Sequence, residues 1–463
     1  MDHTKKVHAC YHQYVKVKWY TNACVRVVSD SGHSILCDPW VNEGAFLGSW
    51  YQWPPIDSNF EGKLLDEPCD GIYISHLHPD HYDPKFIAKF SKQRPEVPIY
   101  VATFAHPWLL RSIRAVVAPG VEVIELPTLM DYKIANDFTI RVFAADTCNP
   151  AICGVSIPCN TEPSLRGIDS IAIFKADSQI IVNANDAMGV NLVSKIASNI
   201  GKADLIMGHY GGASPFPQCF EEVEDKNTAA QKVVETTCKM LINAADSIDA
   251  KLIMPFAGQY VLGGRLSELN SSRATVPLDE AVIKLRALTN REIISIMPHG
   301  EIDLTSGVKT ADYTEPNTNV LKSYLSKISE IKFSYEKKEY DSWHSVEIDL
   351  LASAKKVVDK AKSLNIPFAN SFVIGDGENF VTINLDSNWA NSSALLGSHP
   401  AYETVTEITI PRNLLKSLAT RKEGYRGFTS MHWNQADIGS HFKWKRKGEF
   451  DLTSHMLLNF FGA

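Results

Sequence analysis

Residues 75–81 (SHLHPDH) decide how this chain folds and what it can bind. They follow a short apolar run, GIYIS, whose β-branched and aromatic residues predict a strand. Four side chains that can ligate a metal fall within six positions at the end of this strand: His76, His78, Asp80 and His81. A loop there can turn the first two toward one cation and the last two toward a second. Since imidazole and carboxylate together suit zinc, iron or manganese, we predict a site for one or two divalent metal ions.

The chain around this motif has the pattern of a layered α/β domain. Strand-like runs occupy 15–19, 24–28, 34–38, 99–102, 138–144, 171–174 and 180–184. Apolar residues recur with helical periodicity at 190–200, 230–245 and 278–288. Because the first strands follow one another directly and helices separate the later ones, we expect sheets covered by helices.

A polar stretch with a proline, around 305–320, marks a domain boundary. Beyond it the sequence predicts a helix at 350–364 and strands at 371–374, 380–385 and 405–410. We therefore expect three parts: a metal-binding domain over 1–305, a linker over 306–340 and a smaller accessory α+β domain over 341–463.

Composition narrows the class of protein without naming a function. The 463 residues are 44% hydrophobic and carry a formal net charge of -7, which argues against a main role in binding nucleic acid or an anionic membrane. The nine cysteines contain no CxxC pair, so we expect reduced thiols. No secretory leader and no long apolar run is visible, so we expect a cytoplasmic protein without a membrane span.

The spacing HxHxDH after a strand resembles the signature of the metallo-β-lactamase superfamily. This resemblance implies a four-layer αββα fold. The stretch 183–186 (NAND) ends another strand-like run and precedes a helix. By the resemblance, Asp186 bridges two metal ions; the alternative interpretation of the same residue is a helix N-cap.

Five stretches resemble the CMP-N-acetylneuraminate hydroxylases and related nucleotide-sugar hydroxylases: 38–40 (DPW), 48–50 (GSW), 67–84 (EPCDGIYISHLHPDHYDP), 211–217 (GGASPFP) and 254–258 (MPFAG). Members of that family carry an N-terminal Rieske domain, which needs paired Cys-x-His and Cys-x-x-His motifs. This sequence has one Cys-x-His, at 10–12, without the second motif. We therefore expect the chain to begin directly with the metal-binding domain and to receive electrons from a separate Rieske or ferredoxin protein.

Two positions depart from the dizinc hydrolases of the superfamily. Where those enzymes place a third histidine for the first metal, this chain reads ADTCNP at 145–150, so Asp146, Asn149 or water must fill the role. Where they place a later histidine, this chain has Ala257, whose side chain cannot ligate a metal. The hydroxylase family shares this second departure, which weakens the expectation of a standard two-zinc site.

Two further histidines are candidates for the missing functions. His209 follows the strand-like run ADLIMG and could supply a ligand, an acid–base group or a substrate contact. The alternative is a loop histidine hydrogen-bonded to the backbone. His299, in MPHG after another strand, is a further candidate ligand.

Candidates for substrate binding lie in a glycine-rich turn and at an arginine. Backbone N–H groups of Gly211, Gly212 and Ser214 can approach a phosphate or a carbonyl, although the same residues can form only a tight turn. Arg265 is a candidate for binding an anionic substrate. The basic run 443–447 (KWKRK) could stack and neutralise a nucleotide, but we favour an edge strand with protective lysines.

The site residues leave three functions open. Histidines and carboxylates with open coordination positions suit non-haem Fe(II), and the resemblance implies hydroxylation of a nucleotide-linked or amino-sugar-like small molecule. A zinc-bound hydroxide, with Asp80 orienting the water, would instead hydrolyse a lactone, ester or phosphodiester. A degenerate site kept as a scaffold is the third alternative, which the intact motif disfavours. Asp80 and His209 are the candidate catalytic groups, and a homodimer is an open alternative to a monomer.

Overall fold

The protein is described by a computed structural model that covers residues 14–104, 107–144, 169–188, 190–337, 344–364, 369–419, 432–449 and 451–462. Two candidate ligands, Asp146 and Asn149, lie outside these ranges. The cysteines within them are buried and free, as expected: Cys24, Cys37, Cys69, Cys219 and Cys238. No helix in the described ranges is both long enough and apolar enough to cross a membrane.

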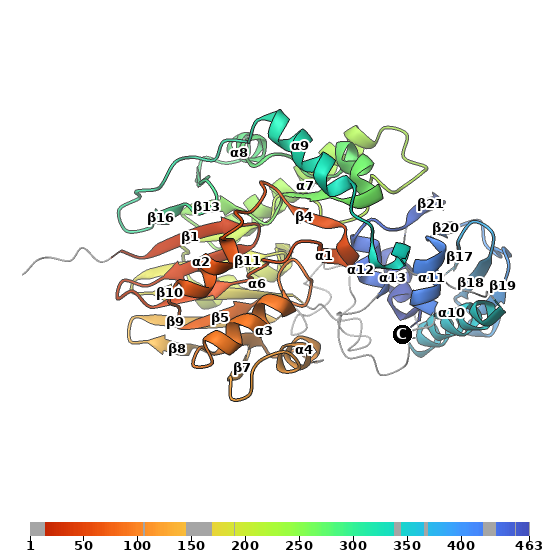
Figure 1. Ribbon diagram of the computed structural model, residues 1–463, viewed down its shortest axis with the longest axis horizontal. Helices are drawn as coiled ribbons and strands as arrows, with labels where there is room; N and C mark the ends of the chain where they lie inside the picture. The colour runs from red at the N-terminus through yellow and green to blue at the C-terminus, as the bar shows by residue number, and fades with distance from the viewer. Residues whose placement is uncertain are drawn as a thin grey trace, which may run out of the picture.

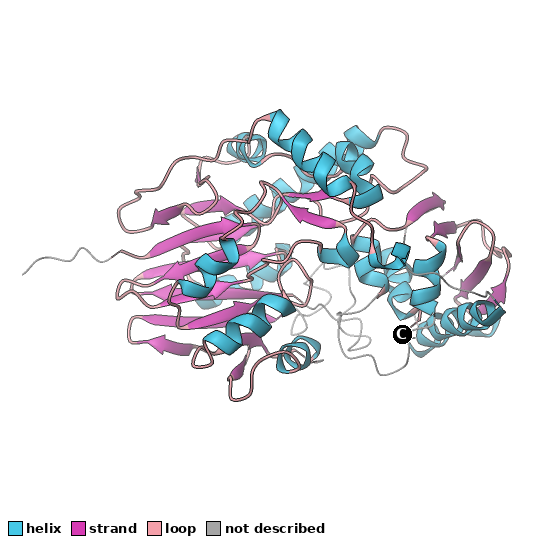
Figure 2. Cartoon of the chain, in the orientation of Figure 1, coloured by secondary structure: helices cyan, strands magenta, loops and turns pink. Residues whose placement is uncertain are grey.

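Two seven-stranded sheets lie face to face and form the centre of the first domain (Figures 1 and 2). The first sheet has the order β16 (Glu301–Asp303), β1 (Lys16–Thr21), β2 (Cys24–Val28), β3 (Ser34–Cys37), β5 (Gly71–Ile74), β6 (Ile99–Ala102) and β7 (Val123–Leu126). The second has the order β15 (Glu292–Ile293), β13 (Leu252–Pro255), β12 (Leu205–Gly208), β11 (Gln179–Asn185), β10 (Ser170–Ala176), β9 (Phe138–Ala144) and β8 (Tyr132–Ala135).

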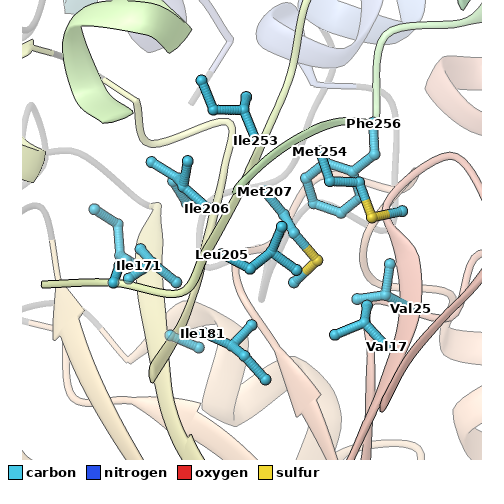
Figure 3. Packing of buried hydrophobic residues seen from close by; sticks show 14 of the residues in the cluster. Val17, Val25, Ile171, Ile181, Leu205, Ile206, Met207, Ile253, Met254 and Phe256 are labelled. Atoms are coloured by element: carbon cyan, nitrogen blue, oxygen red, sulfur yellow. The ribbon is translucent and has the colours of Figure 1, made fainter. Parts of the chain in front are cut away.

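Apolar side chains from both sheets form one core between them. The central strands β3 and β5 are buried along their whole length, which is typical of parallel strands covered on both faces. Figure 3 shows part of this core, with Val17 and Val25 of the first sheet in one cluster with Met207 and Met254 of the second. Burial of each such side chain contributes about 1.5–3 kcal/mol to folding.

Helices cover the outer faces and complete the four-layer αββα arrangement that the resemblance implied. The first sheet packs against α2 (Phe60–Asp66), α3 (Pro84–Gln93) and α4 (Trp108–Arg114). The second packs against α6 (Val190–Ile200), α7 (Lys226–Ser247) and α8 (Leu278–Arg286). Asp83 begins α3 by accepting hydrogen bonds from the backbone N–H groups of Lys85 and Phe86, so the helix starts directly after the metal-binding motif.

A second domain follows, built on a five-stranded sheet of the order β19 (Ser393–Leu396), β18 (Phe380–Asp386), β17 (Ala369–Gly375), β20 (Val405–Thr409) and β21 (Lys443–Lys447). Its helices are α10 (His344–Leu364), α11 (Arg412–Ala419), α12 (Trp433–Ile438) and α13 (Leu452–Leu457). This mixed sheet with packed helices matches the predicted α+β character of the region.

The stretch predicted as a linker is folded over much of its length. Helix α9 (Thr318–Ser329) packs Ile328 against Tyr51, Trp53 and Val261, at a small two-stranded antiparallel sheet of β4 (Trp50–Gln52) and β14 (Tyr260–Leu262). The described residues also form a short α-helix, α1 (Ala45–Gly48), and the 3-10 helices η3 (Gly264–Ser272), η4 (Ser334–Lys337), η5 (Trp389–Asn391) and η6 (Leu458–Phe460). The exact boundaries 305, 340 and 341 stay predictions.

The two domains share a hydrophobic core and a backbone connection. Phe46 and Trp50 of the first domain lie in one buried cluster with Trp433 of the second. The outer edge of β21 is bonded to the first domain, since Trp444 N donates to Cys219 O at 2.9 Å. This edge strand, predicted from its lysines, therefore joins the domains, and the junction lies beside the strand ends described below.

Candidate metal centre

The candidate site lies where strands of both sheets end. Five positions meet at this edge: Asp38 after β3, the motif 75–81 after β5, Asp169 directly before β10, Asp186 after β11 and His209 after β12. β3 runs parallel to β5, β11 runs parallel to β12, and β10 is antiparallel to β11. The topology thus brings residues that are far apart in the sequence to one place.

Ser170 ties the two sheets together at this edge. Its hydroxyl oxygen lies 2.7 Å from the Tyr73 hydroxyl and donates to the Ser75 carbonyl at 2.5 Å, and both partners belong to the first sheet or its loop. The Ser170 carbonyl in turn accepts a hydrogen bond from Asn185 Nδ2 at 2.9 Å. Asn185 Oδ1 accepts from Asp186 N at 2.6 Å. These buried bonds fix the spacing between the motif loop and Asp186.

Two overlapping groups of side chains can each hold a metal ion. The first consists of His76, His78 and Asp169, and the second of His76, His81 and Asp186; within each group the ligand atoms lie within 4.8 Å of one another. His76 Nε2 is 3.7 Å from Asp169 Oδ1 and 3.9 Å from Asp186 Oδ2. His81 Nε2 is 3.4 Å from the same Asp186 oxygen. Because both groups use His76 Nε2, which has one lone pair, His76 can ligate only one ion at a time.

Hydrogen bonds on the far side of each ring select the nitrogen that faces the site. The Ser75 hydroxyl donates to Asp38 Oδ2 at 2.7 Å, so it accepts from His76 Nδ1 at 3.0 Å. His81 Nδ1 donates to the same Asp38 oxygen at 3.0 Å. In the neutral rings both bonds place the proton on Nδ1 and present Nε2 to a metal, which is the usual arrangement around ligating histidines. Asp80 and Asp186 raise the pKa of His81, so a metal would displace a proton from this ring.

His78 is oriented in the opposite sense. Its Nδ1 lies 2.9 Å from His76 Nε2 and faces the site, while its Nε2 lies 3.1 Å from Asn434 Oδ1 of α12 in the second domain. Its ring also lies against Phe46, with centroids 5.7 Å apart. The second domain therefore reaches the candidate metal centre directly.

Several buried polar atoms at the site have no hydrogen-bond partner in the described structure. They are Asp80 Oδ1, His81 Nε2 and Asp169 Oδ1. A buried, unpartnered oxygen or nitrogen costs about 1–3 kcal/mol. His81 and Asp169 belong to the two groups and Asp80 to neither, and the donor set of imidazole and carboxylate in these groups fits a divalent cation.

The electrostatics of the site agree with this fit. Burial raises the pKa of Asp80 to about 7 and that of Asp169 to about 6, because each carboxylate loses its hydration. Burial lowers the pKa of His76 and of His78, so both rings are neutral and able to ligate. For Asp186, burial is outweighed by His81, which holds the pKa of this carboxyl below its usual range.

The structure brings together most of the predicted ligands and adds one. His76, His78, His81 and Asp186 enter the two groups, and Asp80 Oδ2 lies 3.6 Å from His81 Nε2. Asp169 was not predicted. It takes a place in the first group beside His76 and His78, while the expectation for Asp146, Asn149 or water falls outside the described residues and stays a prediction. Its only signal in the sequence is an aspartate immediately before a predicted strand.

The other two candidate histidines have different surroundings. His209 Nδ1 donates to Asn185 O at 3.0 Å and lies 4.0 Å from Asp186 Oδ1, so it borders the site without joining either group. His299 packs against the rings of Tyr20 and Phe60 and is in neither group. The backbone bond of His209 matches the loop alternative, and its place beside Asp186 keeps a substrate contact open.

The candidate substrate-binding residues are engaged in packing. Gly212 N donates to Ala274 O at 2.7 Å, and a Cβ on Gly211 would lie 2.7 Å from Gly258 O, so close backbone approach explains both glycines. Ser214 Oγ bonds within its own turn. Arg265 Nη2 donates to Tyr335 Oη at 3.0 Å, and Arg265 Nε pairs with Glu336 at 3.1 Å, at the domain junction. Their roles in substrate binding stay predictions.

Comparison with known proteins agrees with the site and the fold. Residues 16–154 match the model of the beta-lactamase superfamily domain. A cytidine monophosphate-N-acetylneuraminic acid hydroxylase of Xenopus laevis is 24% identical over 455 residues, covering 93% of this chain and 71% of the relative. That of Danio rerio is 24% identical over 287 residues, covering 58% and 43%. The Homo sapiens relative, named as inactive, is 23% identical and covers 93% and 84%.

Solved structures with some likeness include the metallo hydrolase Igni18 of Ignicoccus hospitalis, at 13% identity and a TM-score of 0.39, covering 62% of this chain and 97% of that one. Another is the metallo-beta-lactamase fold protein YhfI of Bacillus subtilis, at 12% identity and a TM-score of 0.36, covering 60% and 95%. The strand-end histidines and aspartates, the αββα layers and the sequence matches together indicate an enzyme that carries a beta-lactamase superfamily domain at residues 16–154 and is similar over most of its length to the cytidine monophosphate-N-acetylneuraminic acid hydroxylases.

Proposed function

We propose that this enzyme is a non-haem iron oxygenase that hydroxylates a nucleotide-linked or amino-sugar-like small molecule. The observation that carries the proposal is the first ligand group, in which two histidines, His76 and His78, are joined by one carboxylate, Asp169. A set of two histidines and one carboxylate is typical of non-haem Fe(II) oxygenases, where the metal keeps positions for oxygen and substrate.

The substrate class is taken from the relatives. The proteins of Xenopus laevis and Danio rerio are named as hydroxylases of cytidine monophosphate-N-acetylneuraminic acid. Similarity to the former extends over 93% of this chain and so includes the second domain. A nucleotide-linked acyl amino sugar is therefore the first substrate to test.

Hydroxylation also requires an electron source. One atom of O2 enters a C–H bond of the substrate to give C–OH, and the other atom leaves as water, which consumes two electrons and two protons. We propose that a separate Rieske or ferredoxin protein supplies the two electrons. Such a donor needs only transient contact near the metal centre.

The side chains around the metal have distinct tasks in this proposal. Asp169 and Asp186 are 29% and 22% exposed, whereas His76 is fully buried, so substrate approaches from the carboxylate side. His209 borders that side, and since its Nδ1 is bonded to Asn185 O, its Nε2 is the atom to contact substrate. The unpartnered Asp80 Oδ1 is placed to hold or accept a proton.

The experiment is metal analysis of protein purified without air, followed by incubation with CMP-N-acetylneuraminic acid, O2 and a chemical or ferredoxin reductant. We expect about one iron per chain or more, and a product heavier than the substrate by one oxygen atom. The matched variant Asp169→His replaces the carboxylate of the first group by a third imidazole and is expected to lose hydroxylation. Protein that holds only zinc and forms no product after iron loading would contradict the proposal.

A second candidate function is hydrolysis of a lactone, ester or phosphodiester by a zinc-bound hydroxide. The observation in its favour is the second group, because His76, His81 and Asp186 lie directly beside the first group and share a ligand with it. Two adjacent cations lower the pKa of a bound water, and Asp80 can accept its proton. Zinc-loaded protein that cleaves a generic phosphodiester or lactone, with the activity abolished in His78→Ala, would favour this function.

A further inference from the structure

The contact between His78 and Asn434 joins a ligand histidine to the second domain, whereas His76 and His81 are bonded to Ser75 and Asp38 of the first. An amide oxygen only accepts hydrogen bonds, so Asn434 Oδ1, at 3.1 Å, requires a proton on His78 Nε2. A neutral imidazole then has its lone pair on Nδ1, which is the nitrogen that lies 2.9 Å from His76 Nε2 and faces the site. Asn434 thus selects the tautomer of His78 that can bind a metal.

The helix that carries Asn434 is held firmly against the first domain. The backbone N–H of Asn434 donates to His432 Nδ1 at 3.1 Å, and the neighbouring Trp433 is buried against Phe442 and Phe461. At the other end of α12, a Cβ on Gly439 would lie only 2.7 Å from Phe46 O, so glycine is needed for this close approach.

Phe46 receives a second contact from the same region of the chain. His441 Nε2 donates to Phe46 O at 2.9 Å, and the Phe46 ring lies against His78. The second domain therefore holds both the amide that bonds His78 and the aromatic residue that packs beside it.

The other ligands take their support from within the first domain. His76 is oriented by Ser75, and His81 by Asp38. The Nε2 of His78, by contrast, is bonded to a residue 356 positions later, in the second domain.

We propose that Asn434 is a positioning residue of the metal centre, through which the second domain sets the metal affinity of the His76–His78–Asp169 group. This inference rests on the proposed metal centre and on neither oxidation nor hydrolysis. It predicts that metal binding depends on a side chain that does not itself touch the metal.

The test measures metal affinity in full-length variants by competition of Zn²⁺ and Co²⁺ with a chromophoric chelator. Asn434→Leu removes the acceptor at similar size and is expected to weaken one of the two binding steps about 10–100-fold, the usual effect of losing such a partner. Asn434→Asp keeps an acceptor oxygen and is expected to restore wild-type affinity. The Co²⁺ absorption spectrum is expected to change in the leucine variant alone.

The control is Ser440→Ala, which removes a hydrogen bond across the same junction, from Gln218 Nε2 to Ser440 Oγ at 3.1 Å, without touching a ligand. Melting temperatures in excess chelator show whether each variant folds like the wild type. The inference is overturned if Asn434→Leu binds as tightly as the wild type, if Asn434→Asp is as weak as the leucine variant, or if Ser440→Ala loses as much affinity. A wild-type protein that binds no metal overturns both this inference and the proposed function, whereas normal metal binding without hydroxylation overturns the function alone.

Discussion

The two domains meet at one metal centre but contribute different things to it. Among the described residues, the first domain provides the ligands of both groups from the ends of neighbouring strands, together with a supporting carboxyl group, Asp38, that lies one residue beyond β3. The second domain provides a neutral amide, Asn434, and part of the aromatic wall around Phe46. Ligands are thus fixed by the sheets themselves, whereas the contact of His78 with Asn434 exists only when the domains are docked.

This difference predicts that the largest loss of bound metal follows from removing His76, the ligand that both groups share. His76→Ala deletes the nitrogen common to both groups, so we expect almost no bound metal and no measurable activity. Metal content per folded chain after dialysis against Zn²⁺ or Fe²⁺ is the measurement. His299→Ala serves as the control because His299 lies in neither group. A variant at position 76 that keeps one full equivalent of metal would show that the groups do not share this ligand.

Asp169→Asn is expected to weaken metal binding by the first group and to leave the second group intact. The amide keeps the size of the side chain but is a much poorer ligand, so the first group is expected to bind more than 100-fold more weakly, beyond the roughly 10–100-fold loss for a supporting residue. The second group retains His76, His81 and Asp186, and metal content should fall toward one equivalent. The number of equivalents titrated by Co²⁺ checks this, and unchanged two-site binding would remove Asp169 from the site.

The site residues that the first domain provides could in part be predicted from the sequence, whereas the contact from the second domain could not. The motif 75–81 is contiguous, so its chemistry is visible without a fold, and hydrophobic periodicity located β2, β6 and α6 at the bounds the structure has. Asp169 could not be ranked above other aspartates, because its role depends on β10 running antiparallel to β11.

Asn434 was still further from prediction. Asparagine is common in helix first turns, and its contact with His78 arises only from the docking of two domains. For Gly211 and Gly212 the sequence suggested more than the structure requires. Their pattern predicted a substrate-binding turn, whereas close packing against Gly258 and Ala274 accounts for both glycines. Local chemistry is readable from the sequence, whereas contacts across a domain junction require the structure.

Asp38→Asn tests the support that the first domain provides for itself. The carboxylate accepts from His81 Nδ1 and from Ser75, so its neutralisation is expected to weaken the second group about 10–100-fold. The first group should change less, because His78 is held by Asn434. The two binding steps in a Co²⁺ titration distinguish these outcomes. If Asp38→Asn and Asn434→Leu weakened the same step, the assignment of one support to each group would be wrong.

The smallest expected effect is a change in the pH dependence of stability, caused by His441 at the junction of the two domains. Its Nδ1 accepts from Tyr335 at 2.8 Å and its Nε2 donates to Phe46 O, and Tyr335 accepts in turn from Arg265, so the ring must be neutral. Burial, reinforced by Arg265, lowers the pKa of His441 to about 3, below the roughly 6.5 of an unfolded histidine. Between these two pKa values the unfolded chain binds a proton on His441 that the folded protein does not. The contribution of the neutral ring to the free energy of unfolding is therefore complete above pH 6.5 and is lost as the pH falls toward 3.

For one such group, the free energy of unfolding decreases by about 2 kcal/mol between pH 7 and pH 5. His441→Gln cannot titrate, so its unfolding free energy should fall by about 2 kcal/mol less than that of the wild type over the same interval. Urea unfolding of both proteins at the two pH values, in chelator to exclude metal effects, measures the difference. If the free energy of unfolding decreased equally in both proteins, the ring of His441 would not stay neutral at the junction. The hydrogen bonds through Tyr335 would then not contribute to the docking that places Asn434 beside His78.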